Sequence, residues 1–177
     1  MKAENILLIG FMGVGKGRLA RELAARTDFI ALDTDDLIVS LENRKIKKIF
    51  SQEGESYFRD IEQKVANWLE LHVSNTIIST GGGFFAVENL NRIGTVVFLR
   101  SDFDTILKEM LDHPKSNKKI KKRPLFQDAK KAQQLFETRQ PLYTAKADII
   151  IDVAGRQSED IASEITRHLN LTASSDA

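Results

Sequence analysis

Cysteine is absent from the 177 residues, and proline and histidine occur only three times each. Without cysteine the chain has no disulfide framework, no thiolate metal site and no cysteine nucleophile. The three histidines show no spacing that would suit a zinc site. No apolar run approaches the roughly 18 residues of a membrane-spanning helix, and the run at the start leads into glycines rather than a signal-peptide cleavage site. These absences favour a cytoplasmic protein with no membrane partner.

An excess of one charge is also lacking, because 26 basic residues balance 25 acidic ones to a net charge of +1. This balance argues against a nucleic-acid-binding protein that relies on overall charge. The one strongly basic stretch, residues 113–123, contains no Phe, Tyr or Trp that could stack on bases. A solvated segment is therefore the preferred interpretation, and nucleic-acid binding is the last alternative.

Short apolar runs alternate with helical patterns along the chain, which is typical of a parallel α/β fold. Buried strands are predicted at Asn5–Ile9, Phe29–Leu32, Thr76–Ser79, Thr95–Leu99 and Ala147–Asp152. Helices are predicted at 16–26, 35–43, 46–52, 54–72, 102–111, 128–139 and 158–170. Five fully buried strands with helical crossovers imply a three-layer, doubly wound domain. We expect one domain over residues 1–171 and a disordered tail at 172–177.

Two of the predicted helices carry more specific expectations. In the stretch 54–72, Phe58, Trp68 and their apolar neighbours recur at helical spacing, which predicts that these aromatic rings pack in the core. Pro141 is a stop signal, so the helix that starts near residue 128 is expected to end at about Arg139.

The segment GFMGVGKG, from Gly10 to Gly17, matches the phosphate-binding P-loop pattern at every position but the last. Its glycines let backbone N–H groups form an anion site, to which the start of a helix adds its dipole. Lys16 can reach the β- and γ-phosphates of a nucleotide. The strand pattern before the loop and the helix pattern after it favour this interpretation over a tight turn with a surface lysine. The residues expected to bind ATP here are Gly13, Val14, Gly15, Lys16, Gly17 and Arg18.

Gly17 stands where the pattern has Ser or Thr, whose hydroxyl is a ligand of Mg²⁺. The metal must then be held by phosphates, water and acidic side chains elsewhere. In this respect the loop resembles that of adenylate kinases, which also read Gly-Lys-Gly. The same departure motivates an alternative from another class, a catalytically silent nucleotide-binding module.

Two aspartates, Asp33 and Asp35, close the second predicted strand. Side chains two residues apart point the same way on an extended chain, so both carboxylates could face the cleft at the carboxyl ends of the strands. One carboxylate could anchor Mg²⁺ through water, and the other could accept a proton from a substrate hydroxyl. The structural alternative is helix capping, which is the preferred interpretation for Asp36.

Three consecutive glycines, Gly81, Gly82 and Gly83, follow the third predicted strand. Such a run after a buried strand suggests close approach of the backbone to a ligand rather than an ordinary turn. The glycine run therefore joins the P-loop and the aspartates as part of the candidate site.

Six motifs in this order resemble the shikimate kinase family from about Asn5 to Leu169: GFMGVGKG, LDTDD, GESYFRDIE, ISTGGG, KRPLF and ETRQPLY. The resemblance implies a P-loop kinase fold with a mobile lid at about residues 112–126. It also implies an enzyme that transfers a phosphoryl group from ATP to the 3-hydroxyl of shikimate, with Mg²⁺, in chorismate biosynthesis. We expect a monomer whose partners are ATP and shikimate.

By the same resemblance, Arg59 and Arg139 would bind the substrate carboxylate, a use that suits the paired N–H donors of guanidinium. Asp35 would hydrogen-bond the ring hydroxyls, including the one that attacks, and the backbone of the glycine run 81–83 would help. Asp33 would support the metal. Without the resemblance, Arg59 would be an exposed helix arginine paired with a neighbouring Glu55 or Asp60, and Arg139 a cation at a helix C-terminus.

The resemblance also implies roles for two arginines further along the chain. Arg123, in KRPLF, would close with the lid over ATP and act with Lys16 in stabilising the transferring phosphoryl group. Arg156 would lie against the adenine. The nearest alternative among enzymes is another P-loop metabolite kinase, such as a gluconate kinase, which the paired arginines and the triple glycine disfavour.

Overall fold

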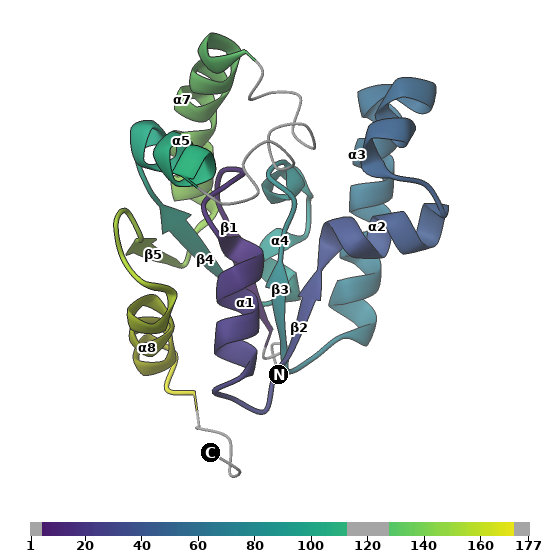
Figure 1. Cartoon of the computed structure of the whole chain (residues 1–177). Coiled ribbons are helices and arrows are strands. Elements are labelled where there is room, and N and C mark those ends of the chain that lie inside the picture. Colours follow the sequence, from purple (N-terminus) through teal and green to yellow (C-terminus); the bar gives the residue numbers. More distant parts are fainter. Residues whose placement is uncertain (1–4, 113–127, 172–177) are drawn as a thin grey trace.

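The computed structural model describes residues 5–112 and 128–171 of the chain. Within them, five parallel strands form one sheet in the order β2-β3-β1-β4-β5 (Figure 1). The strands are β1 (Ile6–Ile9), β2 (Ile30–Asp33), β3 (Thr76–Ser79), β4 (Thr95–Arg100) and β5 (Ile149–Asp152). The α/β class and the five-stranded parallel sheet predicted from the sequence are thereby confirmed. The expected lid, apart from Asp112, and the expected tail lie outside the described residues.

Helices cover both faces of the sheet, which gives three layers (Figure 1). They are α1 (Lys16–Ala24), α2 (Thr34–Glu42), α3 (Ile46–His72), α4 (Leu90–Ile93), α5 (Phe103–Asp112), α7 (Ala129–Lys146) and α8 (Ser158–His168), with a 3₁₀ turn, η1 (Phe84–Ala86). The sequence did not predict α4 or η1, because each is too short to show a helical period. No helix among the described residues is long and apolar enough to cross a membrane.

The central strand β1 divides the core in two by the alternation of its side chains. Leu7 and Ile9 pack into one apolar cluster with α3, α4, α5 and α7, whereas Ile6 and Leu8 pack into another with α1 and α8. All four side chains are buried. Because a parallel strand with helices on both faces buries every residue, β1 reads as a continuous apolar run.

The two edge strands differ from the prediction of five fully buried strands. Ile30 in β2 is 72% exposed, and Ile150 in β5 is 38% exposed. Each of these strands pairs with only one neighbour, β2 with β3 and β5 with β4. An apolar run predicts a strand, but it does not show whether that strand lies at the centre or the edge of the sheet.

Two predicted helices, 46–52 and 54–72, form one kinked helix, α3. The kink lies at Gly54, whose φ of 85° and ψ of 179° are not helical. On the C-terminal part, Phe58, Val65 and their stripe are buried as predicted, but Trp68 is 46% exposed. The prediction of a core position for Trp68 is therefore wrong, because Trp68 lies at the margin of the stripe and turns one face to solvent.

The prediction that Pro141 ends its helix is also wrong, because α7 continues to Lys146. An internal proline removes one hydrogen bond and costs a helix about 3 kcal/mol. Phe136 before it and Tyr143 after it are both buried in the core. Burial of these two rings on one helix offsets the cost, so packing decides where α7 ends.

Candidate active site

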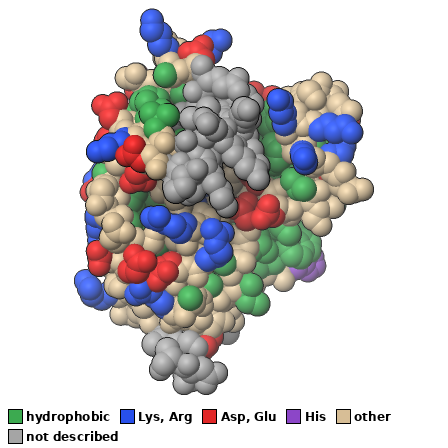
Figure 2. Space-filling view, viewed as in Figure 1, with side chains coloured by type: hydrophobic (Ala, Val, Ile, Leu, Met, Phe, Trp, Pro, Cys, Tyr) green, Lys and Arg blue, Asp and Glu red, His purple; other side chains and the backbone are tan. Residues whose placement is uncertain are grey.

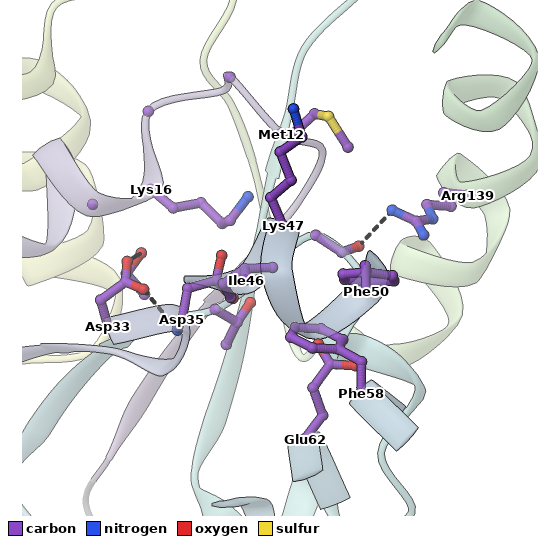
Figure 3. Close-up of a pocket in the computed structure, with 18 of the residues that line it drawn as sticks. Met12, Lys16, Asp33, Asp35, Ile46, Lys47, Phe50, Phe58, Glu62 and Arg139 are labelled. Atoms are coloured by element: carbon purple, nitrogen blue, oxygen red, sulfur yellow. Dashed lines mark hydrogen bonds between the residues drawn. The ribbon is translucent and has the colours of Figure 1, made fainter. Parts of the chain in front are cut away.

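A cavity of about 820 Å³ opens at the carboxyl ends of β1, β2 and β3 (Figure 3). Its wall is formed by the loop after β1, the start of α2, both parts of α3, the glycine run after β3, and α7. The cavity brings together most of the residues predicted from the sequence: Gly13, Gly15, Lys16, Gly17, Arg18, Asp33, Asp35, Arg59, Gly81, Gly82, Gly83 and Arg139. The carboxyl edge of a parallel sheet is the usual ligand side of such folds.

The loop between β1 and α1 curves around the start of the helix. Gly15 is the N-cap of α1 and has a left-handed conformation, with φ of 96° and ψ of 15°, which glycine adopts without a steric cost. The N–H of Val14 donates to the carbonyl of Phe11 at 3.3 Å and closes the turn. A curved backbone at a helix N-terminus is a site for phosphate.

Lys16 is the first residue of α1, and its side chain lies under the curve of the loop (Figure 3). Its Nζ donates to the carbonyl oxygens of Gly10 at 2.6 Å and Phe11 at 3.0 Å. Only 8% of the residue is exposed. A charged amine held in this way is placed at the phosphate side of the cavity.

Asp33 ends β2 and caps α2, so the prediction that Asp36 caps this helix is wrong. One Asp33 carboxylate oxygen, Oδ1, accepts from the backbone N–H groups of Asp35 at 2.9 Å and Asp36 at 3.4 Å. Asp35 lies in the first turn of α2 rather than on an extended chain. The two carboxylates nevertheless line the same cavity, because the helix begins directly at the end of the strand.

The second oxygen of Asp33, Oδ2, accepts a hydrogen bond from the buried Ser79 hydroxyl at 2.8 Å. A Cβ added at Gly17 would lie 3.6 Å from Ser79 Oγ, 3.7 Å from Arg21 Nη1 and 3.8 Å from Asp33 Oδ2. The place of the missing P-loop hydroxyl thus adjoins two oxygen atoms, the ligands that Mg²⁺ prefers, and the guanidinium of Arg21. Within the described residues no cluster of three or more His, Cys, Asp or Glu could hold a metal. The residues therefore fit a Mg²⁺ ion that takes its other ligands from phosphate and water.

The three glycines after β3 each lie against a different predicted substrate-binding residue. A Cβ at Gly81 would lie 2.5 Å from Asp35 Oδ1, and one at Gly82 would lie 3.4 Å from Arg139 Nη1. A Cβ at Gly83 would overlap the guanidinium of Arg59. Glycine at these positions lets two cations and one carboxylate approach a single turn of backbone from three directions.

Arg59 is held by two carboxylates of its own helix. It pairs with Glu55 at 2.9 Å and with Glu62, which is 2% exposed. Burial raises the pKa of the Glu62 carboxyl, and the adjacent Arg59 guanidinium acts in the opposite direction. Glu62 was not among the site residues predicted from the sequence, although its i+3 spacing from Arg59 in GESYFRDIE was a signal for this pair.

Arg139 lies within α7 and not at a helix C-terminus, contrary to the alternative considered for it. Its Nη1 donates to the carbonyl of Gly82 at 3.1 Å (Figure 3). Facing it, Phe50 and Phe58 of α3 stack with ring centroids 4.5 Å apart and give the cavity an apolar side. A cavity with an apolar side and two guanidinium groups suits a ring that carries a carboxylate.

Two predicted residues that the structure describes, Val14 and Arg156, are not brought into this cavity. Val14 uses its N–H within the loop and does not line the wall. Arg156 donates to the carbonyl of Asp152 at 2.8 Å and pairs with Glu164 at 2.6 Å, also away from the wall. Arg123 lies outside the described residues.

Fold and site together define the class of the protein. A glycine-rich loop joins the central strand of a parallel sheet to a helix whose first residue is a buried lysine, and an aspartate ends the strand that follows. This arrangement is that of the P-loop kinases.

Comparison with known proteins narrows the class to one family. A family model described as shikimate kinase matches residues 12–170. A curated shikimate kinase of Helicobacter hepaticus is 40% identical over 149 residues, which are 84% of this chain and 86% of that protein. The structure of a shikimate kinase from Acinetobacter baumannii, in complex with shikimate, is 31% identical with a TM-score of 0.81, and covers 95% of this chain and 93% of that one. The chain belongs to the shikimate kinase family.

A gluconokinase from Sinorhizobium meliloti also has this fold, with a TM-score of 0.60 over 96% of this chain and 93% of its own. Its sequence identity is 14%. A likeness at this level concerns the fold alone, so the gluconate kinase alternative gains nothing from it.

Proposed function

We propose that this protein transfers the γ-phosphoryl group of ATP to the 3-hydroxyl of shikimate, giving shikimate 3-phosphate and ADP, in chorismate biosynthesis. The observation that carries the proposal is the glycine run, against which Asp35, Arg59 and Arg139 converge beside a phosphate loop in one cavity. A hydroxylated ring acid offers a carboxylate to the arginines and hydroxyls to the aspartate. Membership of the family and the shikimate held by the Acinetobacter baumannii relative support the same substrate.

On the substrate side, Arg59 and Arg139 bind the carboxylate, each through charge-assisted hydrogen bonds. Glu62 keeps Arg59 at the cavity wall, since the Glu62 carboxylate is buried and pairs with the guanidinium. Asp35 accepts hydrogen bonds from the ring hydroxyls and orients the one that attacks. Backbone groups of the glycine run supply further polar contacts.

On the nucleotide side, the N–H groups of the loop and the start of α1 bind the phosphates, with Gly13, Gly15 and Arg18 at the cavity wall. Lys16 neutralises charge that develops on the transferring phosphoryl group. Arg123, as the KRPLF motif indicates, acts on the same charge, and Arg156 lies against the adenine. In-line transfer needs no covalent intermediate on the protein.

Mg²⁺, when bound with ATP, supplies positive charge at the β- and γ-phosphates. Asp33 would hold it through water, with Ser79 beside it, because Gly17 offers no hydroxyl. We further propose that the protein works as a cytoplasmic monomer without a nucleic-acid partner. Light scattering coupled to size exclusion tests the monomer.

The direct experiment is an ADP-release assay with ATP, Mg²⁺ and either shikimate or gluconate. We expect turnover with shikimate only. Turnover with gluconate alone would identify the other metabolite kinase, and ATP binding without turnover on either would identify a silent module.

The assigned carboxylate contacts are tested by calorimetry on Arg59→Ala and Arg139→Ala. Each should weaken shikimate binding by about 10- to 150-fold, the value of one charge-assisted hydrogen bond, while ATP binding stays near native. Lys48→Ala, an exposed substitution on α3, is the matched control. Equal losses for ATP and shikimate would contradict the assignment.

A further inference from the structure

One backbone carbonyl, that of Gly82, accepts hydrogen bonds from two side chains of α7. The Tyr143 hydroxyl donates to it at 2.6 Å, and Arg139 Nη1 donates at 3.1 Å. Arg139 and Tyr143 are four residues apart, so they lie on the same face of the helix. The carbonyl has two lone pairs, and these two donors use both of them.

Of the two donors, the tyrosine is held more firmly. Tyr143 is 1% exposed and packs edge-on against Phe85, with ring centroids 4.8 Å apart, and against Phe98 at 5.3 Å. Burial raises the pKa of its phenol to about 12. The hydroxyl therefore stays protonated, and able to donate, over the whole neutral range. Arg139, by contrast, lines the cavity.

The direction of the Gly82 carbonyl also fixes the direction of the next amide. In a planar trans peptide the carbonyl of Gly82 and the N–H of Gly83 point opposite ways. Since the Gly82 carbonyl points to α7, the Gly83 N–H points away from α7. In the described part of the chain, neither the Gly82 nor the Gly83 N–H donates a hydrogen bond, and both glycines line the cavity.

We propose that Tyr143 is a positioning residue: its hydroxyl anchors the Gly82 carbonyl, so that Arg139 can turn to the carboxylate of the substrate. The Gly82 carbonyl is partly shielded from solvent, so losing a protein donor weakens its hydrogen bonding. With Tyr143 in place, the carbonyl stays bonded when Arg139 leaves it. Without the hydroxyl, Arg139 is the remaining donor, and binding the substrate must break that bond. This inference rests on the proposed function, because it assumes that Arg139 binds the substrate.

The test is Tyr143→Phe, which removes the hydroxyl and keeps the ring. We expect the KM for shikimate to rise by about 2- to 13-fold, the value of one neutral hydrogen bond, with the Kd of ATP near native. Phe98→Leu is the matched control, because it disturbs packing on the same ring and leaves the hydroxyl in place. Phe98→Leu should lower thermal stability without a selective rise in the KM for shikimate over the Kd of ATP.

A double-mutant cycle separates positioning from general support of the fold. In an Arg139→Ala background, Tyr143→Phe should change the KM by less than about twofold, because its effect runs through Arg139. Additive effects in the cycle, or an unchanged KM in the single variant, would overturn the inference and leave the proposed function standing. A wild-type protein with no turnover on shikimate would overturn both.

If Tyr143→Phe does not fold, ¹⁹F NMR on the wild-type sequence labelled with fluorotyrosine gives the answer. The chain has two tyrosines, so Tyr57→Phe assigns the signals. The Tyr143 signal should shift when shikimate binds and stay in place when ADP binds. A Tyr143 signal that does not respond to shikimate would refute the anchor.

Discussion

At the scale of single residues, Lys16 and Lys47 show how differently two lysines of one cavity can be placed. Both line the cavity, but Lys16 is buried under its loop and Lys47 is exposed. A buried, hydrogen-bonded amine can stabilise charge in a transition state more strongly than a solvated one. The two lysines therefore form a matched pair for substitution.

Lys16→Met should leave the fold intact and lower the rate of phosphoryl transfer by several orders of magnitude, roughly 10³-fold. Methionine keeps the length of the side chain and removes its charge. Turnover at saturating ATP and shikimate is the measurement, with circular dichroism as the check on folding. Lys47→Met should stay within a few-fold of native. A folded Lys16→Met protein with near-native turnover would contradict the role of the loop.

Gly17→Ser should give a protein that folds at least as well and needs less free Mg²⁺ for half-maximal activity. A Cβ at this position meets only ordinary contacts, the nearest at 3.6 Å, so serine has room. Replacing glycine in the first helical turn is worth up to a few tenths of a kcal/mol. The added hydroxyl would lie beside Ser79, Arg21 and Asp33, where it can ligate the ion.

The measurements for Gly17→Ser are turnover against free Mg²⁺ and, separately, calorimetry of ADP binding at several Mg²⁺ concentrations. Gly17→Ala is the control, because it adds the Cβ without the oxygen. An equal Mg²⁺ requirement in the native protein and in both variants would mean that the metal does not lie beside residue 17.

At the scale of elements, α3 consists of two arms joined at Gly54. The first arm carries Ile46 and Phe50 to the cavity, and the second carries Phe58, Arg59 and Glu62. Gly54 has a conformation, φ 85° and ψ 179°, that is essentially restricted to glycine. The angle between the arms, and with it the width of the substrate side, depends on this one residue.

Gly54→Ala should therefore lower the free energy of unfolding by about 1–3 kcal/mol and raise the KM for shikimate more than the KM for ATP. A Cβ there meets nothing within 4 Å, so the cost is backbone strain and not a clash. Urea denaturation and steady-state kinetics measure the two effects. Ser56→Ala, an exposed change two residues away, is the control. Unchanged stability in Gly54→Ala would refute the strain.

The sequence predicted elements where local chemistry decides them. Apolar runs located all five strands, and the glycines and Lys16 located the phosphate loop. Prediction from the sequence failed where residues distant along the chain decide the structure. Pro141 lies inside α7 because Phe136 and Tyr143 are buried on either side of it. Ile30 is exposed because β2 lies at an edge. The residues next to Pro141 and Ile30 in the sequence indicate neither feature.

The candidate site follows the same rule. Its residues could be named from six short motifs, but their contacts could not. Tyr143 bonds to Gly82 across 61 positions of sequence, and Ser79 bonds to Asp33 across 46. Asp33 was expected to face the cleft, yet one of its oxygens also caps α2. Spacing along the chain predicts a pair on one helix, such as Arg59 and Glu62, but not a pair between elements.

At the scale of the whole molecule, burial of Tyr143 makes the free energy of unfolding depend on pH in the alkaline range. The pKa of Tyr143 is about 12 in the folded protein and 10.0 in an unperturbed phenol. A raised pKa means that the folded state favours the neutral phenol. The contribution of Tyr143 to the free energy of unfolding is therefore complete below pH 10 and is lost as the pH rises towards 12. Its size is on the order of 2–3 kcal/mol.

The free energy of unfolding should accordingly fall between pH 10 and 12 in both the native protein and Tyr143→Phe. The fall should be larger in the native protein, by about 2–3 kcal/mol. Urea denaturation at a series of pH values measures it. Comparison with the variant removes the shared effects of lysine and of Tyr57, whose pKa is also raised, through its hydrogen bond to Glu42. Parallel pH curves for the two proteins would contradict the prediction.

The exposed indole of Trp68 has a practical consequence for anyone who studies this enzyme by fluorescence. Trp68 is the only tryptophan in the chain, so all indole emission comes from one point on the second arm of α3. Its ring lies 6.3 Å from that of His72, and it does not line the cavity. Hydrophobic, basic and acidic side chains are mixed over the face of the molecule shown in Figure 2. The emission is therefore a label-free signal for the melting of α3. Occupancy of the active site needs a reporter placed elsewhere.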